Sequence, residues 1–173
     1  MLCPVILGQS YQDGMEYQAQ KHIYRCRYRV AVSDGIHFYG FTNTKNILED
    51  MDSKVRGYES PKFDSELKLL ELLYEVYGGK EKMQLMGSES ISLYYYVGMD
   101  FTVKELKIEF ITYESEKLKT TIFQMEAIEN LMKERIRIIF NRKSPLYRDA
   151  IYTTSYSKLY TISKIPELLE KMR

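Results

Sequence analysis

Three arginines stand at alternate positions in one short segment of the sequence, Arg25, Arg27 and Arg29. A β-strand projects alternate side chains from one face, so these three would form a row with a spacing of about 7 Å. No acidic residue alternates with them to neutralise the row. Guanidinium groups bind phosphate and carboxylate through paired hydrogen bonds. The spacing therefore predicts a surface for a nucleic-acid backbone or for an acidic protein surface.

Two further sets of residues would enlarge this basic surface. Residues 133–173 carry 10 positive and 4 negative side chains, whereas residues 57–132 carry 8 positive and 14 negative ones. The C-terminal residues expected to extend the arginine row are Arg135, Arg137, Arg142, Lys143 and Arg148. Tyr94 and Tyr96 would then stack bases beside it. The alternative is an ordinary solvated strand face whose arginines pair with glutamates of residues 57–132.

His37 is expected on the opposite side of the same hairpin, among apolar neighbours. A histidine on an apolar face is most often a hydrogen-bonded core residue. The functional alternative is a metal-independent ribonuclease, in which His37 transfers a proton while an arginine stabilises phosphate charge. The expected geometry opposes this alternative, because the arginine row faces away from His37.

A second catalytic possibility is a small restriction-type nuclease. Such an enzyme uses an acidic residue followed by Glu-x-Lys on a strand, and Asp100, Glu105 and Lys107 meet that local pattern. The pattern has little specificity in a chain rich in Lys and Glu. His22 and His37 are the only histidines, and neither has a Cys or a carboxylate at a diagnostic ligand spacing. The sequence therefore predicts no metal site and no cofactor.

The composition is that of an ordinary soluble protein, with 45% hydrophobic residues, 28% charged residues and a net charge of +1. The length favours a single domain over residues 1–173, in which residues 1–22 form an irregular segment. Cys3 and Cys26 form no CxxC or Cys/His motif, which indicates reduced thiols. No apolar stretch approaches the ~18 residues that cross a membrane. We therefore expect a cytoplasmic protein without a membrane partner.

Two-residue alternation predicts a β-hairpin near the N-terminus. The alternation begins at Ile23 and continues past Asp34-Gly35 to Thr42. Asp-Gly between two such runs is typical of a two-residue type I′ turn. This turn would put the arginines on one face and on the other the pairs Val32 with His37, Val30 with Tyr39, and Tyr28 with Phe41.

Three- and four-residue spacing of apolar side chains predicts the helices. They are expected over residues 45–56, over 61–77, over 116–140 and from Pro166 onward. Thr44 and Ser115 would cap two of them, and Gly78-Gly79 would end the helix over 61–77. The apolar face of that helix is wide, so it lies either inside the fold or against a second copy of the chain.

Further strands are expected over residues 90–101, 104–113 and 150–162, where apolar and polar side chains alternate or Thr and Tyr accumulate. The element order is then ββααββαβα. Because strands come in adjacent pairs, the sequence predicts a single α+β domain with an antiparallel sheet, an N-terminal β-hairpin and three to four packed helices.

These observations favour a non-enzymatic protein that binds a macromolecule through arginines and tyrosines. The partner would be a nucleic acid or a nucleic-acid-binding host protein with an acidic surface. The chain has 16 Tyr and no Trp, a Lys- and Tyr-rich composition that is common in phages and mobile elements. An accessory or inhibitor protein of the anti-defence type is therefore expected. The alternatives are a small nuclease and an oligomeric structural protein joined through the helix over 61–77.

Overall fold

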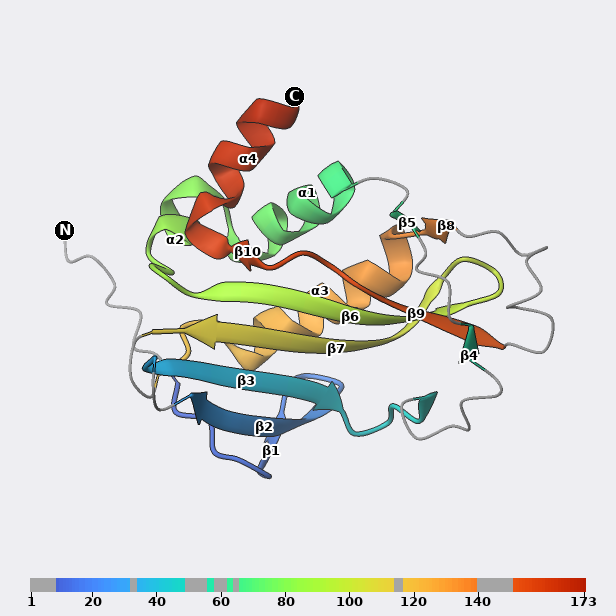
Figure 1. Cartoon of the computed structure of the whole chain (residues 1–173), viewed down its shortest axis with the longest axis horizontal. Helices are drawn as coiled ribbons and strands as arrows, with labels where there is room; N and C mark the ends of the chain where they lie inside the picture. Colours follow the sequence, from blue (N-terminus) through green and yellow to red (C-terminus); the bar gives the residue numbers. More distant parts are fainter. Residues whose placement is uncertain are drawn as a thin grey trace.

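The computed structural model describes residues 9–31, 34–48, 56–57, 62–63, 66–113, 117–139 and 151–173. Its main feature is an eight-stranded sheet in the order β1-β2-β3-β7-β6-β9-β4, with β10 paired to β6 (Figure 1). All neighbours are antiparallel except the parallel pair β4 and β9. The strands are β1 Glu16–Gln18, β2 Ile23–Ala31, β3 Ile36–Asn43, β4 Arg56–Gly57, β6 Ser90–Gly98, β7 Val103–Thr112, β9 Tyr152–Tyr156 and β10 Tyr160–Thr161.

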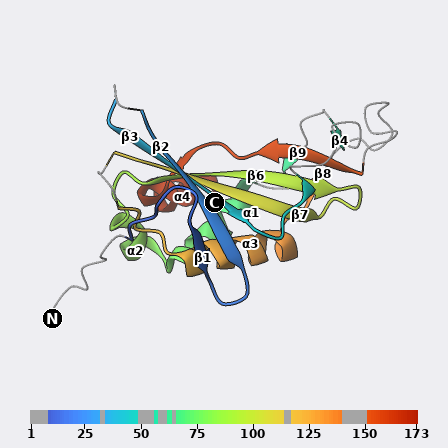
Figure 2. The same cartoon turned by 90° about the horizontal axis from the view of Figure 1, so that it is seen from below.

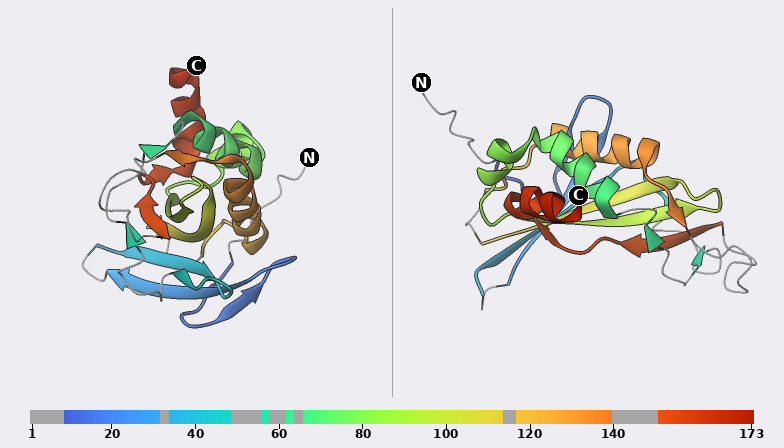
Figure 3. Two further views of the ribbon diagram at one scale, coloured as in Figure 1. Left: turned by 90° about the vertical axis from the view of Figure 1, so that its right-hand side faces the viewer. Right: turned by 90° about the horizontal axis from the view of Figure 1, so that it is seen from above.

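Helices cover one side of this sheet. They are α1 Glu66–Tyr77, α2 Lys80–Gln84, α3 Ile122–Arg135 and α4 Ile165–Met172, which follows a 3-10 turn, η4 Ile162–Lys164. A separate two-stranded sheet pairs β5 Lys62–Phe63 with β8 Ile138–Ile139. Figures 2 and 3 agree that α1 and α3 lie on the same side of the sheet, and Figure 1 shows α4 projecting away from it. The predicted α+β fold with an antiparallel sheet is confirmed.

The hydrophobic core lies between the sheet and the helices α1 and α3. Burial of apolar side chains is the main favourable contribution to folding, and alternate strand residues supply them. The inward residues include Tyr24, Cys26, Tyr39, Phe41, Ile91, Leu93, Ile108 and Phe110, with Leu69, Leu70 and Leu73 of α1 and Met125, Ile128 and Met132 of α3. The wide apolar face of α1 is thus buried by the chain itself. An oligomer joined through this helix stays an untested prediction.

The predicted hairpin is present, but its register differs by two residues. The structure pairs Val30 with His37 and ends the ladder at Ala31 and Ile36. A type I′ turn needs positive φ at both central residues. Gly35 has a φ of +61°, whereas Asp34 is not among the positive-φ residues, so the predicted type I′ turn at Asp34-Gly35 is wrong. A shift of two residues keeps each described side chain on its predicted face, which preserves the predicted separation of the arginines from the core. Val32, predicted to face His37, lies outside the described residues.

The helix predicted over residues 45–56 is wrong where the structure describes it. The N–H groups of Ile47 and Leu48 donate to the Glu105 carboxylate of β7 at 2.9 and 3.0 Å. The described part of the loop after β3 therefore binds to the sheet and contains no α-helical residue, and Arg56–Gly57 form strand β4. Residues 49–55 lie outside the described residues.

The helix predicted over residues 61–77 begins later than expected. Strand β5 occupies Lys62–Phe63, so α1 starts at Glu66; Ser60-Pro61 lies outside the described residues. The helix ends as predicted, because Gly78 adopts a φ of +76°. The chain then forms the short helix α2, which no pattern in the sequence predicted.

The long helix predicted over residues 116–140 is shorter at both ends. Thr121 is its N-cap, and a reciprocal capping box joins Thr121 and Gln124. At the other end Ile136 is extended and β8 follows, in keeping with the strand preference of β-branched residues. The predicted cap Ser115 lies outside the described residues.

The remaining expected elements are close to the observed ones. Strands β6 and β7 fall within or next to the predicted ranges, and α4 has Pro166 in its first turn as expected. The strand predicted over 150–162 is divided into β9 and β10. The segment 1–22, expected to be irregular, contributes the short strand β1 within its described part.

Candidate functional site

The predicted arginine row is present on the side of the sheet opposite α1 and α3. Arg25, Arg27 and Arg29 are exposed, while the residues between them are buried or half-buried. We call this side the outer face. By strand register it also carries Phe38, Gly40 and Thr42 of β3 and Lys107 and Glu109 of β7.

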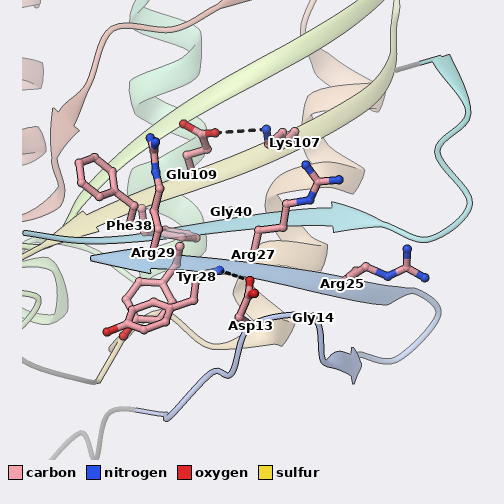
Figure 4. Close-up of a pocket in the computed structure, with 12 residues that line it drawn as sticks. Asp13, Gly14, Arg25, Arg27, Tyr28, Arg29, Phe38, Gly40, Lys107 and Glu109 are labelled. Atoms are coloured by element: carbon pink, nitrogen blue, oxygen red, sulfur yellow. Dashed lines mark hydrogen bonds and ion pairs between the residues drawn. The ribbon is translucent and has the colours of Figure 1, made fainter. Parts of the chain in front are cut away.

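A hollow of about 590 Å³ opens over the middle of these strands (Figure 4). Gly40 lies at its floor, paired with Arg27 of β2 on one side and with Glu109 of β7 on the other. Lys107 and Arg29 also line it. We refer to this feature as the Gly40 hollow.

The fold itself does not require a glycine at the floor of the hollow. The φ of Gly40 lies outside the left-handed region, and a Cβ placed there would be 3.7 Å from Cε of Lys107, an ordinary contact. By contrast, a Cβ on Gly98 would come within 2.4 Å of Lys104. A glycine inside a strand often marks a position where a ligand approaches the backbone closely.

Two of the basic residues on the outer face are already paired. Arg25 donates to Glu16 of β1 at 2.8 Å, and Nζ of Lys107 lies 3.3 Å from Glu109 on the same strand. Both arginine and glutamate of the first pair are well exposed, so this ion pair contributes little to stability.

The other two arginines of the row make no ion pair with any residue in the described ranges. Arg27 extends over the Gly40 hollow, and the Arg29 guanidinium stands 4.5 Å from the ring centroid of Phe38 (Figure 4). A cation on an aromatic face keeps its full charge. Arg27 and Arg29 therefore carry positive charge that no ion pair in the described ranges neutralises. The Asp13 carboxylate also lines the hollow, where it accepts the N–H of Tyr28 at 2.8 Å.

The acidic residues of the segment 57–132 do not supply the missing counter-charges, because several are buried in structural roles. Glu126 accepts three N–H groups of the turn between β1 and β2, at 2.7 to 3.1 Å. Glu89 accepts two N–H groups just before α3, and burial raises the pKa of its carboxyl. Glu129 is held by side chains of β2, β3 and its own helix. Glu126 and Glu89 thus anchor loops and Glu129 links α3 to the sheet, so these carboxylates do not neutralise the outer face.

The two tyrosines predicted to stack bases differ in exposure. Tyr94 of β6 is 40% exposed on the outer face, and Nζ of Lys107 lies 5.6 Å from its ring centroid. Tyr96 is only 8% exposed, and its ring packs 5.8 Å from that of Tyr152. Tyr94 remains a candidate contact, whereas Tyr96 has no free ring face of comparable size.

The C-terminal basic residues do not extend the row within the described ranges. Arg135 donates to Glu75 of α1 at 2.7 Å, on the helical side of the sheet. Arg137 donates to backbone carbonyls at the end of α3 and bridges to Thr102 in the β6–β7 turn. The expectation that these two adjoin β2 is therefore wrong. Outside the described residues lie Arg142, Lys143 and Arg148.

His37 lies on the core face, opposite the arginine row. Its side chain is 9% exposed, its Nδ1 is 2.7 Å from the Tyr28 hydroxyl, and the two rings stack. Cys26 is also on this face, where burial raises the pKa of its thiol to about 12. The histidine and the arginines are not brought together, so they do not form the ribonuclease arrangement.

The residues of the nuclease pattern are likewise dispersed. Asp100 accepts a hydrogen bond from Lys104 at 2.7 Å, which lowers the pKa of its carboxyl to about 2. The Glu105 carboxylate is bound to the loop after β3, and Lys107 is paired with Glu109. No group of three or more His, Cys, Asp or Glu side chains suited to a metal ion occurs among the residues that the structure describes.

Sequence reasoning missed Asp13, Phe38, Gly40 and Glu109, which line the hollow. Alternation within the hairpin already put Gly40 opposite the arginines, and this was a usable signal. The position of Glu109 depends on the pairing of β3 with β7, two strands far apart in the sequence. No local pattern reports such a pairing.

No helix in the described part of the chain is long and apolar enough to cross a membrane. No protein-family model matches the chain, and no curated protein matches it. Among solved structures it resembles a DUF5043 family protein from Bacteroides uniformis, with a TM-score of 0.58 and 14% sequence identity. The match covers 87% of this chain and 86% of that one. At this identity the likeness shows a shared fold.

Proposed function

We propose that the protein is a non-enzymatic binding protein whose outer face holds a polyanionic macromolecule. The observation that carries this proposal is the pair Arg27 and Arg29, exposed and without an ion pair in the described ranges, beside the Gly40 hollow. Guanidinium groups are weakly hydrated and bind phosphate through two parallel hydrogen bonds, so a repeated anion is their natural partner. An accessory or inhibitor role, of the kind that phages and mobile elements encode, is part of this proposal.

The proposal is tested by binding across a salt series. We expect labelled nucleic acid to bind with an affinity that falls as salt rises, since each neutralised phosphate releases a counterion. Replacing both Arg27 and Arg29 by Glu should abolish binding and leave the melting temperature nearly unchanged, because exposed strand charges contribute little to stability.

A matched control variant makes the same change in net charge on another part of the molecule. Lys82 of α2 and Lys171 of α4 are exposed and belong to the helical part of the molecule. Replacing both by Glu should leave binding within about twofold, apart from a weak long-range effect that salt screens. Equal losses in the two double variants would refute an outer-face site.

A further inference from the structure

We infer that the Gly40 hollow receives one base of a single-stranded nucleic acid while the β2 arginines hold its backbone. This inference rests on the proposed function and gives the polyanion a chemical class. Four features of the hollow support it: its floor, its charge pattern, its stacking surface and its size.

The floor of the hollow is a glycine where the fold would accept another residue. Gly40 occupies an inner strand, has a conformation that any residue adopts and has room for a Cβ. A glycine there weakens the strand, since it adds backbone entropy to the unfolded state and packs nothing. The absence of a side chain nevertheless leaves the hollow open between β2 and β7. A flat ring lying over the strand would use that space.

The charged groups that line the hollow favour a nucleotide over an acidic peptide as the ligand. The hollow is lined by groups of both signs, the cationic Arg27 and Arg29 and the carboxylates of Asp13 and Glu109 (Figure 4). An acidic peptide would offer only carboxylates, which complement the arginines but leave the oxygens of Asp13 and Glu109 without a donor from the partner. A nucleotide carries phosphate oxygens for the arginines and, in most bases, amino groups that donate to a carboxylate.

The edge of the hollow offers a surface on which a base can stack. The Arg29 guanidinium lies over the Phe38 ring, which holds the planar group at the edge of the hollow. Arginine planes and aromatic rings are the surfaces on which proteins stack unpaired bases. Tyr94, exposed on the same face beyond Lys107, offers a second ring along the direction from β2 to β6.

The volume of the hollow favours a single-stranded nucleic acid over a duplex as the ligand. A volume of about 590 Å³ is that of a small-ligand site and admits a base that has left its stack. A base inside a duplex is covered by its neighbours and its partner, and must be extruded at a cost before it can enter a pocket. The hollow therefore selects single strands, whether RNA or DNA.

The experiment measures the affinity and salt slope of short labelled single strands, RNA and DNA, and of the matched duplex. The key variant is Gly40→Val, which fills the hollow and leaves every charge in place; Gly40→Ala is the milder second variant. Thr42→Val is the matched control, because it changes a residue of the same face and strand without adding volume. Melting temperatures establish that each variant is folded.

We expect Gly40→Val to weaken single-strand binding by about 5- to 150-fold, the loss of one stacked base, with an unchanged salt slope. Replacing Arg27 and Arg29 by Ala should instead lower the slope by about 0.7 per lost phosphate contact. If the arginine variants weaken binding and Gly40→Val does not, the base site is wrong and the proposed function stands. Equal affinity for duplex, or for polyglutamate, would also overturn the inference. If no polyanion binds at all, both proposals fail.

Discussion

Replacing Gly40 by Ala should stabilise the protein and weaken binding at the same time. Gly40 lies in β3 between β2 and β7, and an added Cβ meets only ordinary contacts, the nearest at 3.7 Å from Lys107. A glycine in the middle of a strand is less stable than alanine by about 0.5–1 kcal/mol. No native contact opposes this gain.

The expected shift follows from the size of the chain. For 150–250 residues a change of about 1 kcal/mol moves the melting temperature by about 2–4 °C. Gly40→Ala should therefore raise it by about 1–4 °C. Differential scanning calorimetry measures the shift, and urea unfolding gives the free energy at room temperature independently.

Gly35 provides the contrast. A Cβ there has nothing within 4 Å, but its φ of +61° is unfavourable for alanine. Gly35→Ala should lower stability by about 1–2 kcal/mol through backbone strain alone. If Gly40→Ala proved as destabilising as Gly35→Ala, the claim that the fold leaves this position free would be refuted.

Three further predictions concern polar groups on the helical side of the molecule. Thr121→Ala should cost about 1 kcal/mol by removing the N-cap of α3, measured by urea unfolding, and an unchanged midpoint would contradict the capping box. Glu126→Ala should cost about 1.5–3 kcal/mol and increase hydrogen exchange in the turn between β1 and β2, whose N–H groups lose their acceptor. Burial raises the pKa of Glu89 above 4.5, so its contribution to stability is lost as pH rises above that value. Relative to Glu89→Gln, the unmodified protein should therefore gain stability as pH falls from neutral towards 4.5, and a constant difference would show that the pKa is not raised.

Local patterns in the sequence were sufficient for the faces of the sheet. Alternation from Ile23 to Thr42 separated the core residues from the arginines, and a register shift of two residues left this separation intact. The start of α4, with Pro166 in its first turn, and the end of α1 just before Gly78 also followed from local backbone chemistry.

Long-range contacts account for most of what was missed. The loop after β3 has helical periodicity, yet its N–H groups bind Glu105 across the sheet. The sequence likewise contains an acidic segment, but only the fold reveals that Glu126 and Glu129 are buried. The Gly40 hollow forms only when β7 pairs with β3 and brings Lys107 and Glu109 beside the hairpin. The spacing of residues in the sequence does not indicate that β3 pairs with β7.

The most direct measurement is a chemical-shift titration of the isotope-labelled protein with a short single-stranded oligonucleotide. The account predicts saturable shifts confined to the outer face, at the backbone amides of β2 and β3 around Gly40 and of β7 around Glu109. Phe38 and Tyr94 ring signals should move with them. Shifts gathered on α1, α3 or α4, or no shifts at all, would contradict it.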